Sequence, residues 1–279
     1  MNIIEILKVI VLGIVEGFTE WLPISSTGHM ILVDEIIHLN QPENFKNMFL
    51  VVIQLGAILA VVVLYFDKLN PFSRRKKPEA KQETFVLWSK IILACIPAAV
   101  IGFLVDDILD EYLMNAYVVA AALIIYGVFF IVIENRNQNK RFEVQKVGDI
   151  SYQTALYIGL FQLLSLIPGT SRSGSTILGA MILGCSRAAS AEFSFFLGIP
   201  VMFGASFLRI IKYGLNFTGA QVFYLIFGMA VAFGFSVYSI KFLMGYIRQH
   251  DFKFFGYYRI VLGGLVLLYF GISAILGYR

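Results

Sequence analysis

Apolar residues gather into long runs along the chain. Six of the runs are close to the roughly 20 residues that an α-helix needs to cross the hydrocarbon core of a bilayer. They cover 47–66, 86–105, 117–134, 190–211, 220–242 and 257–276. Pro97 and Pro200 lie inside two of the runs and are expected to kink them, because proline removes a helical hydrogen bond. The pattern predicts an all-α polytopic membrane protein with six transmembrane helices.

Two further stretches, 3–39 and 151–185, are apolar but interrupted. The first breaks near "LPISSTG" and the second at "PGTSRSG". Proline ends a helix, and serine or threonine caps the next one. Non-helical backbone at membrane depth is tolerated only where protein or a water-filled cavity surrounds it. Each stretch therefore predicts a re-entrant helix–loop–helix hairpin.

Charge in the loops predicts the topology. Cytoplasmic loops carry an excess of lysine and arginine. Basic residues dominate three connections: 67–90, 135–148 and 243–256. The connection around 106–111 is acidic, with Asp106, Asp107, Asp110 and Glu111. Six spans with the three basic connections inside leave both termini outside.

The two halves of the chain resemble each other. "GIVEGFTEWLPISS" at 13–26 aligns with "GLFQLLSLIPGTS" at 159–171, which places Glu16 on Gln162 and, with a one-residue gap, Ser26 on Ser171. Each half, about 1–140 and about 145–279, would then hold one hairpin and three spans. Because three is an odd number of crossings, the second half would be inverted. We expect one integral membrane domain over 1–279, built as an inverted-topology repeat.

The composition is typical of a membrane protein and argues against other classes of protein. Of 279 residues, 58% are hydrophobic and 14% are charged, whereas soluble domains are about a quarter charged. The net charge of +4 requires no nucleic acid partner. Cys95 and Cys185 lie in separate apolar runs, so they are expected to be buried free thiols.

The first interrupted stretch carries a pair of carboxylates. Glu16 and Glu20 are four residues apart and share a helix face. Their repulsion calls for a cation, an arginine or a proton held by one of them. In one interpretation both lie at the membrane surface, with Trp21 as an interfacial anchor. However, a helix that begins near Ile3 places them about 20–26 Å along its axis, and ionisable groups at that depth indicate function.

Hydroxyl and imidazole groups follow these carboxylates. Ser25, Ser26, Thr27 and His29 lie at the break and at the start of the next helix. A neutral imidazole acts as a base or a nucleophile near neutral pH. Gln162, which mirrors Glu16, is a candidate to line the same cavity.

The second break, "PGTSRSGST", is typical of an anion site. Arg172 lies among hydroxyl groups at a helix N-terminus, where unpaired N–H groups and the helix dipole favour anions. Its planar guanidinium suits phosphate oxygens. A plain hydroxyl-capped turn, with the arginine reaching lipid headgroups, is the alternative.

If the two breaks meet, anion donors face carboxylates and a nucleophile or base. That set is sufficient for phosphoryl transfer, which depends on positioning and charge neutralisation. A lipid-phosphate or organic-anion transporter, or flippase, is the competing function, since inverted repeats with midplane anion sites are typical of transporters.

"EGFTEWLPISSTGH" at 16–29 and "PGTSRSGST" at 168–176 resemble the two signature motifs of the bacterial undecaprenyl-diphosphatases, also called bacitracin-resistance proteins. The resemblance covers essentially the whole chain. It implies a multi-pass plasma-membrane hydrolase that converts undecaprenyl diphosphate to undecaprenyl phosphate and inorganic phosphate. This reaction recycles the lipid carrier for peptidoglycan synthesis and confers bacitracin resistance. The resemblance also implies an outward-facing site, stimulation by Mg²⁺ or Ca²⁺, and homodimers in some members.

Carried onto this sequence, the resemblance makes Glu16 and Glu20 the acidic pair. They are also the candidate metal ligands, and Glu20 is the catalytic one. Ser26 and His29 are the candidates for nucleophile and base. Arg172, with Ser171, Ser173 and Thr176, would hold the diphosphate. We expect Ser26 to attack the terminal phosphorus while Glu20 or His29 accepts its proton; in the rival mechanism His29 is itself phosphorylated.

Overall fold

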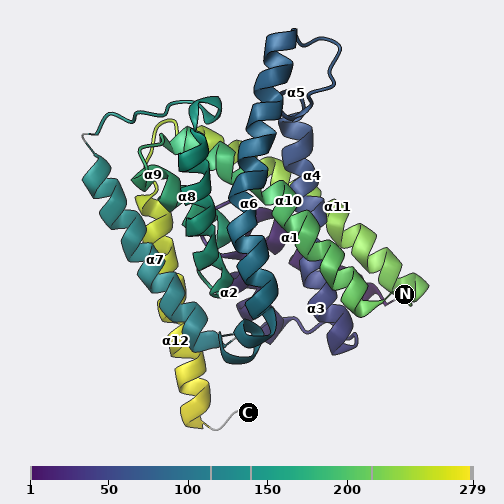
Figure 1. The fold of residues 1–279 in the computed structure, drawn as a ribbon. Coiled ribbons are helices and arrows are strands. Elements are labelled where there is room, and N and C mark those ends of the chain that lie inside the picture. Colours follow the sequence, from purple (N-terminus) through teal and green to yellow (C-terminus); the bar gives the residue numbers. More distant parts are fainter. Residues whose placement is uncertain (1, 114, 139, 215, 277–279) are drawn as a thin grey trace.

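The computed structural model describes residues 2–113, 115–138, 140–214 and 216–276. Figure 1 shows a bundle of helices joined by loops. Within the described ranges the β-structure is one isolated bridge between Val144 and Cys185. The predicted all-α class is therefore confirmed.

Six described helical segments are long and apolar enough to cross a membrane. They agree with the six predicted spans and extend them by a few residues at most ends. The segments are Glu43–Leu64, Pro78–Val105, Ala116–Asn137, Arg187–Tyr213, Gly219–Tyr246 and Lys253–Ile275. They correspond to α3 (Glu43–Val52) with α4 (Gln54–Leu64), α6 (Pro78–Leu113), α7 (Ala116–Asn137), α10 (Arg187–Tyr213), α11 (Gly219–Tyr246) and α12 (Lys253–Leu276). Helices α6 and α10 continue through Pro97 and Pro200.

Two details differ from the sequence prediction. The first span is interrupted at Ile53, whose carbonyl accepts a 2.9 Å bond from the Gly56 N–H, a tighter spacing than in an α-helix. No proline marks this turn. The predicted acidic loop at 106–111 is instead helical backbone, since α6 runs to Leu113; the side chains of Asp106, Asp107, Asp110 and Glu111 lie outside the described residues.

The two interrupted stretches form two matching units. Helix α1 (Ile3–Thr19) is followed by a break and by α2 (Ser26–Ile36). In the second unit, α8 (Tyr152–Gln162) and the short 3-10 helix η2 (Leu163–Leu166) precede the break and α9 (Arg172–Ile182). The breaks therefore lie where the Pro-Ser-Thr-Gly composition predicts them.

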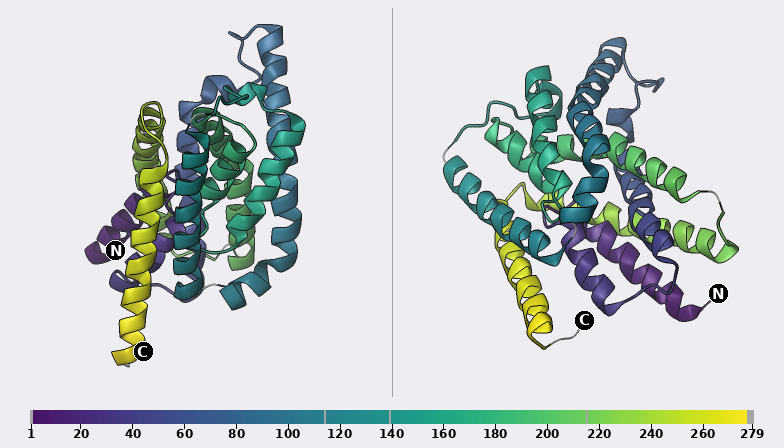
Figure 2. Two further views of the ribbon diagram at one scale, coloured as in Figure 1. Left: turned by 90° about the vertical axis from the view of Figure 1, so that its left-hand side faces the viewer. Right: turned by 60° about the horizontal axis from the view of Figure 1, so that its bottom comes forward.

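Each of the two units packs against spanning helices. Helix α1 packs on α11, and α8 packs on α6. Helix α2 contacts α7 and α12, so the first unit lies between the α7–α12 pair and α11 (Figure 2). The α7–α12 contact depends on small residues: a Cβ atom added at Gly127 would lie 2.7 Å from the Gly256 carbonyl oxygen, and one added at Gly256 would lie 2.7 Å from that of Gly127.

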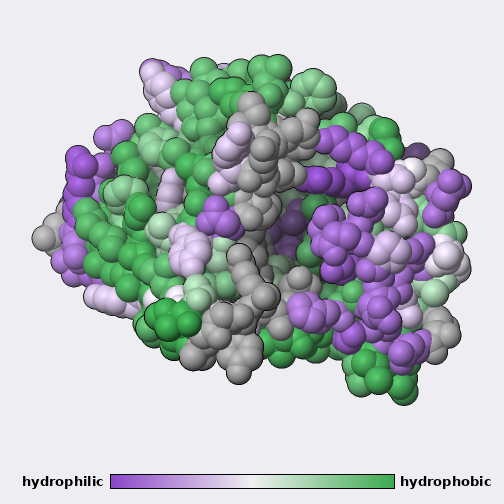
Figure 3. Space-filling model, turned by 90° about the horizontal axis from the view of Figure 1, so that it is seen from below, coloured by the Kyte–Doolittle hydropathy of each residue, from purple (hydrophilic) through white to green (hydrophobic). Residues whose placement is uncertain are grey.

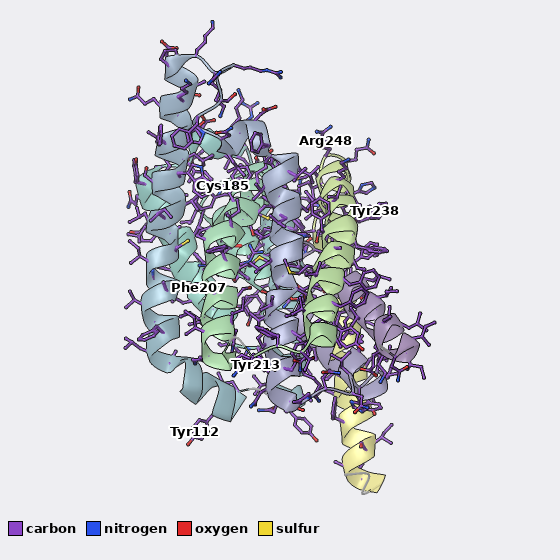
Figure 4. The ribbon with its side chains drawn as sticks, turned by 90° about the vertical axis from the view of Figure 1, so that its right-hand side faces the viewer. Tyr112, Cys185, Phe207, Tyr213, Tyr238 and Arg248 are labelled. Atoms are coloured by element: carbon purple, nitrogen blue, oxygen red, sulfur yellow. The ribbon has the colours of Figure 1, made fainter. Side chains whose placement is uncertain are left out.

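The basic connections gather at one end of the molecule. Figure 1 shows the loop after α5 (Phe66–Leu69), the loop before η1 (Val147–Asp149) and the α11–α12 connection at the upper end. In Figure 4, Arg248 lies at this end and Tyr112 at the opposite end. Figure 3 shows that opposite end, where hydrophilic residues cover one side of a central recess. Many apolar side chains on the spans are exposed, including Phe103, Phe203 and Ile226, as expected for surfaces that face lipid.

Candidate active site

The two breaks meet in the interior. Ser173 of α9 donates its hydroxyl to the carbonyl oxygens of Glu20 at 3.1 Å and Leu22 at 3.3 Å, both in the first break. Residues about 150 positions apart in sequence thus share one site. The juxtaposition expected from the two motifs is present.

The helices that follow the breaks begin in the same way. Ser25 and Ser171 have φ values of 72° and 74° and are the described non-glycine residues with positive φ. Each caps its helix by accepting a bond from a glycine N–H, Gly28 at 3.3 Å and Gly174 at 3.2 Å. This conformation is unfavourable for a residue with a Cβ atom and is held only where the surroundings fix it.

Cap geometry also corrects the alignment of the halves. The sequence alignment placed Ser26 on Ser171, but the matching caps are Ser25 and Ser171. Ser26 and Arg172 therefore hold the same position, the first residue of their helices.

Glu20 joins these two residues. Its Oε1 accepts a 2.9 Å hydrogen bond from Nη2 of Arg172, and its Oε2 accepts a 2.9 Å bond from Oγ of Ser26. The Glu20 and Arg172 side chains are each 9% exposed. Charged hydrogen bonds shielded from water are stronger than exposed ones. The result is a continuous Ser26–Glu20–Arg172 chain.

Arg172 has further hydrogen-bond donors besides the one that binds Glu20. Its Nη1 donates to the Ser194 carbonyl at 2.7 Å, and its guanidinium lies 5.6 Å from the centre of the Trp21 ring. Its Nε is buried and has no hydrogen-bond partner. Gly198 of α10 makes room for the group, because a Cβ atom there would lie 2.9 Å from the guanidinium carbon. A buried donor without a partner fits an anion that is still to be bound.

Glu16 and Gln162 are also buried with unused polar atoms. Both residues are 1% exposed. Oε1 of Glu16 and both side-chain polar atoms of Gln162 have no hydrogen-bond partner. Trp21 is fully buried, so the interpretation with surface carboxylates and an interfacial tryptophan is wrong. Tertiary packing brings these residues inside the protein.

His29 is held by both ring nitrogens. Nδ1 lies 2.7 Å from the Ser25 carbonyl oxygen, and Nε2 lies 2.7 Å from the Tyr258 hydroxyl. A carbonyl oxygen only accepts, so Nδ1 carries a hydrogen. In neutral His29, Nε2 then accepts a hydrogen bond from the Tyr258 hydroxyl, so the lone pair of Nε2 is already occupied.

The other predicted hydroxyl groups are used inside the protein. Ser173 and Thr176 are fully buried, and Thr176 pairs with Ser194 at 2.7 Å. The Ser171 hydroxyl lies 3.1 Å from that of Ser173. The side chain of Thr27, another candidate, lies outside the described residues.

Sequence reasoning missed Arg259 of α12. This residue is fully buried and donates to the carbonyl oxygens of Pro23 at 3.2 Å, Gly169 at 2.9 Å and Thr170 at 2.8 Å. One guanidinium thus ties the two breaks together. The available signal was an arginine inside an apolar span, which by itself indicates a functional site.

The described residues hold no group of three or more His, Cys, Asp or Glu that could enclose a metal ion. The carboxylates of Glu16 and Glu20 remain the candidate metal ligands. Mg²⁺ is commonly held by one or two carboxylates together with waters and substrate phosphates. The unpartnered Glu16 oxygen fits such an ion, shared with a bound phosphate.

Comparison with known proteins places this chain in a family. The model of the family "Bacitracin resistance protein BacA" matches residues 9–265. The chain is 61% identical over 270 residues to an undecaprenyl-diphosphatase of Enterococcus faecalis, covering 96% of this chain and 98% of that protein. It is 60% identical over 278 residues to that of Desulfitobacterium hafniense, covering 99% and 100%. The chain therefore belongs to the bacitracin resistance protein BacA family.

Proposed function

We propose that this chain hydrolyses undecaprenyl diphosphate to undecaprenyl phosphate and inorganic phosphate. The Ser26–Glu20–Arg172 chain of hydrogen bonds is the observation that carries the proposal. It joins a nucleophile, a base and a phosphate-binding group in one buried site. The relatives named undecaprenyl-diphosphatase, at 55–61% identity over nearly the full length, support the substrate. The product is the lipid carrier that peptidoglycan synthesis reuses, which links the activity to bacitracin resistance.

The reaction proceeds in two displacements. Oγ of Ser26 attacks the terminal phosphorus, the bond to the bridging oxygen breaks, and undecaprenyl phosphate leaves. Glu20 accepts the Ser26 proton, because Oε2 already receives that hydrogen bond. Water then attacks the phosphorus of the phosphoserine, the Oγ–P bond breaks, and inorganic phosphate is released while Glu20 returns the proton to Oγ of Ser26.

Arg172 binds the terminal phosphate. Its buried Nε has no other hydrogen-bond partner and can donate to the phosphate while Nη2 stays bonded to Glu20. The phosphate in turn gains a charged donor that stabilises the charge of the transition state. His29 orients the start of α2, since its Nδ1 holds the Ser25 carbonyl.

Glu16 and Glu20 would hold a divalent cation. Such an ion would neutralise diphosphate charge. The unpartnered Glu16 oxygen supports this assignment.

We further infer that both units are re-entrant and that the halves form an inverted-topology repeat. The matching caps at Ser25 and Ser171 support this arrangement, as does the correspondence between α1 on α11 and α8 on α6. The basic connections at one end support an orientation with that end in the cytoplasm. The recess at the opposite end supports a site that faces outward (Figure 3).

The test is phosphate release from undecaprenyl diphosphate by purified protein in detergent. We expect release by the wild type and none above background by Arg172→Ala. Acid-quenched reactions should carry phosphate on Ser26. Phosphate found only on His29 would replace this mechanism with the rival one. Lipid movement in liposomes without phosphate release would replace the hydrolase with a transporter.

A further inference from the structure

Two consecutive residues of α12 reach the first break on either side of the nucleophile. Nη1 of Arg259 donates to the Pro23 carbonyl oxygen at 3.2 Å, and the Tyr258 hydroxyl lies 2.7 Å from Nε2 of His29. Ser26 lies between these two contacts along the chain. Arg259 ties the two breaks together, whereas the steps of phosphoryl transfer make no use of Tyr258.

The backbone between these contacts needs support at Ser25. Its φ of 72° is unfavourable for a residue with a Cβ atom. The Ser25 carbonyl oxygen accepts the backbone N–H of His29 at 3.4 Å, which is long for a hydrogen bond of this kind. The Nδ1 atom of His29 adds a second bond at 2.7 Å. The imidazole therefore provides the shorter of the two hydrogen bonds that hold this carbonyl.

The position of the Ser25 carbonyl affects the nucleophile directly. This carbonyl belongs to the peptide group that joins Ser25 to Ser26, so a rotation of that group would also turn the Ser26 side chain. The Ser26 hydroxyl donates to Oε2 of Glu20 at 2.9 Å. His29 thus acts on the Ser26–Glu20 bond through the backbone, without contact with the phosphate.

Only one neutral form of His29 can make the bond to Ser25. A neutral imidazole carries its hydrogen on Nδ1 or on Nε2. With the hydrogen on Nε2, the lone pair of Nδ1 would face the lone pairs of the Ser25 carbonyl oxygen. The hydrogen bond at one ring nitrogen determines which nitrogen carries the hydrogen. A hydroxyl donor at Nε2 therefore favours the form that holds Ser25.

Tyr258 is well placed to be that donor. Its ring is stacked on the imidazole, with ring centres 5.6 Å apart and an interplanar angle of 8°. The stacking fixes the orientation of the His29 ring, and the 2.7 Å contact fixes its tautomer.

We propose that Tyr258 is a positioning residue for the phosphatase reaction. Its hydroxyl keeps neutral His29 in the Nδ1–H form, and His29 in turn keeps the Ser25 carbonyl and the Ser26 hydroxyl in place. This inference rests on the proposed function, because it takes Ser26 to be the nucleophile. In this arrangement His29 is a donor to the backbone and does not accept the proton of Ser26.

The tautomer of His29 can be measured without substrate. The chain has three histidines, His29, His38 and His250, and the ¹⁵N chemical shift of a ring nitrogen reports whether it carries a hydrogen. In protein with ¹⁵N-labelled histidine, the spectrum of His29→Asn identifies the His29 signals. We expect the Nδ1–H form alone in the wild type and both forms in Tyr258→Phe. The Nε2–H form in the wild type, or an unchanged spectrum in Tyr258→Phe, would overturn the proposal.

Kinetics test the effect of this contact on the reaction. Loss of the hydroxyl in Tyr258→Phe should lower kcat for undecaprenyl diphosphate by about 10²-fold, the effect of a small displacement of a reacting group. KM should stay within about twofold of the wild-type value, because substrate binding is unaffected. Tyr257→Phe, which changes the neighbouring and 57% exposed tyrosine of α12, is the matched control. Equal kcat values for the two variants would contradict the positioning role.

Two amides at position 29 separate positioning from proton transfer. The side-chain nitrogen of asparagine can occupy the place of Nδ1, whereas that of glutamine corresponds to Nε2, and neither amide is a base. We expect His29→Asn to keep a kcat at least about tenfold above that of His29→Gln. Tyr258→Phe added to His29→Asn should change kcat by less than about twofold, because the hydroxyl then has no imidazole to hold.

Equal loss of activity in His29→Asn and His29→Gln would make the imidazole itself a reacting group and overturn the proposal. Absence of phosphate release by the wild type would defeat the proposed function. The spectra would still decide whether Tyr258 sets the tautomer of His29.

Discussion

Ser26 and Arg172 hold the same position at the start of two helices and bind opposite oxygens of one carboxylate, that of Glu20. Helices α2 and α9 thus begin with similar backbone geometry but present different chemical groups. One copy presents a hydroxyl group and the other a guanidinium. The carboxylate between them holds both at hydrogen-bond distance before any substrate binds, which is the pre-organisation that phosphoryl transfer requires.

Removing the nucleophile or its base should abolish turnover. We expect Ser26→Ala and Glu20→Gln each to lower kcat by about 10³-fold or more, since nucleophile and base act as a unit. Phosphate release in detergent measures the effect. Ser165→Ala is the control, because that hydroxyl bonds the Gln162 carbonyl in the second unit. A Ser26→Ala variant with more than about a tenth of wild-type kcat would contradict the mechanism.

Activity also requires space beside the guanidinium of Arg172. Gly198→Ala would place a methyl group 2.9 Å from the guanidinium atoms and displace them. We expect kcat/KM to fall by about 10²-fold, the effect of a displacement of about 1 Å at a reacting centre. Gly204→Ala, in the same helix with nothing within 4 Å of the added carbon, should retain activity. Equal activities of the two variants would show that the position of Arg172 is not limiting.

Arg259 should affect both folding and activity. Arg259→Lys keeps the charge but loses the planar group that reaches carbonyls in both breaks. Hydrogen bonds from charged groups contribute about 1.5–3 kcal/mol each, so the free energy of unfolding should fall by about 2 kcal/mol or more. Thermal unfolding in detergent and phosphate release report the two effects. Arg141→Lys, at an exposed position, should change neither.

Close packing of α7 and α12 makes Gly127 and Gly256 intolerant of a side chain. Each added Cβ atom would lie 2.7 Å from a carbonyl oxygen of the facing helix. We expect Gly127→Ala and Gly256→Ala to destabilise the protein by about 1–3 kcal/mol. Gly264→Ala in α12, which would meet nothing within 4 Å, should be neutral or stabilising. Unfolding temperatures that do not separate the first two variants from the third would contradict this packing argument.

Metal removal tests the role of Glu16. We expect EDTA to suppress phosphate release and Mg²⁺ to restore it. Glu16→Gln should raise the Mg²⁺ concentration for half-maximal activity by about tenfold or more, because a neutral amide is a weaker ligand than a carboxylate. The same half-maximal concentration in Glu16→Gln and wild type would remove Glu16 from the metal site.

Much of the fold could be predicted because membrane helices have a strong local signal. Runs of about 20 apolar residues must be helical, since lipid leaves no other partner for the backbone. The breaks near Pro23 and Pro168 follow from proline and capping chemistry. The interruption at Ile53 and the end of α6 at Leu113 were missed, because no proline lies at either position. Likewise, the acidic composition of 106–111 indicated a loop where the helix continues.

The residues of the candidate site and the meeting of the two breaks could be predicted, but the hydrogen bonds between the residues could not. Glu16, Glu20, Ser26, His29 and Arg172 were identified by their chemistry in apolar surroundings. Their partners were not, since Tyr258, Ser194 and Gly198 lie far away in sequence and have no local signal. Arg259 could have been identified, because it is a charged residue inside an apolar span.

Sequence by itself determined the class, the spans, the two breaks and the residues with reactive groups, because hydropathy and capping act over a few neighbouring residues. Tertiary structure alone decided that Glu20 joins Ser26 to Arg172 and that Arg259 links the two breaks. Each of these relationships joins residues that are not neighbours in the chain, and packing of the helices sets the distances between their side chains.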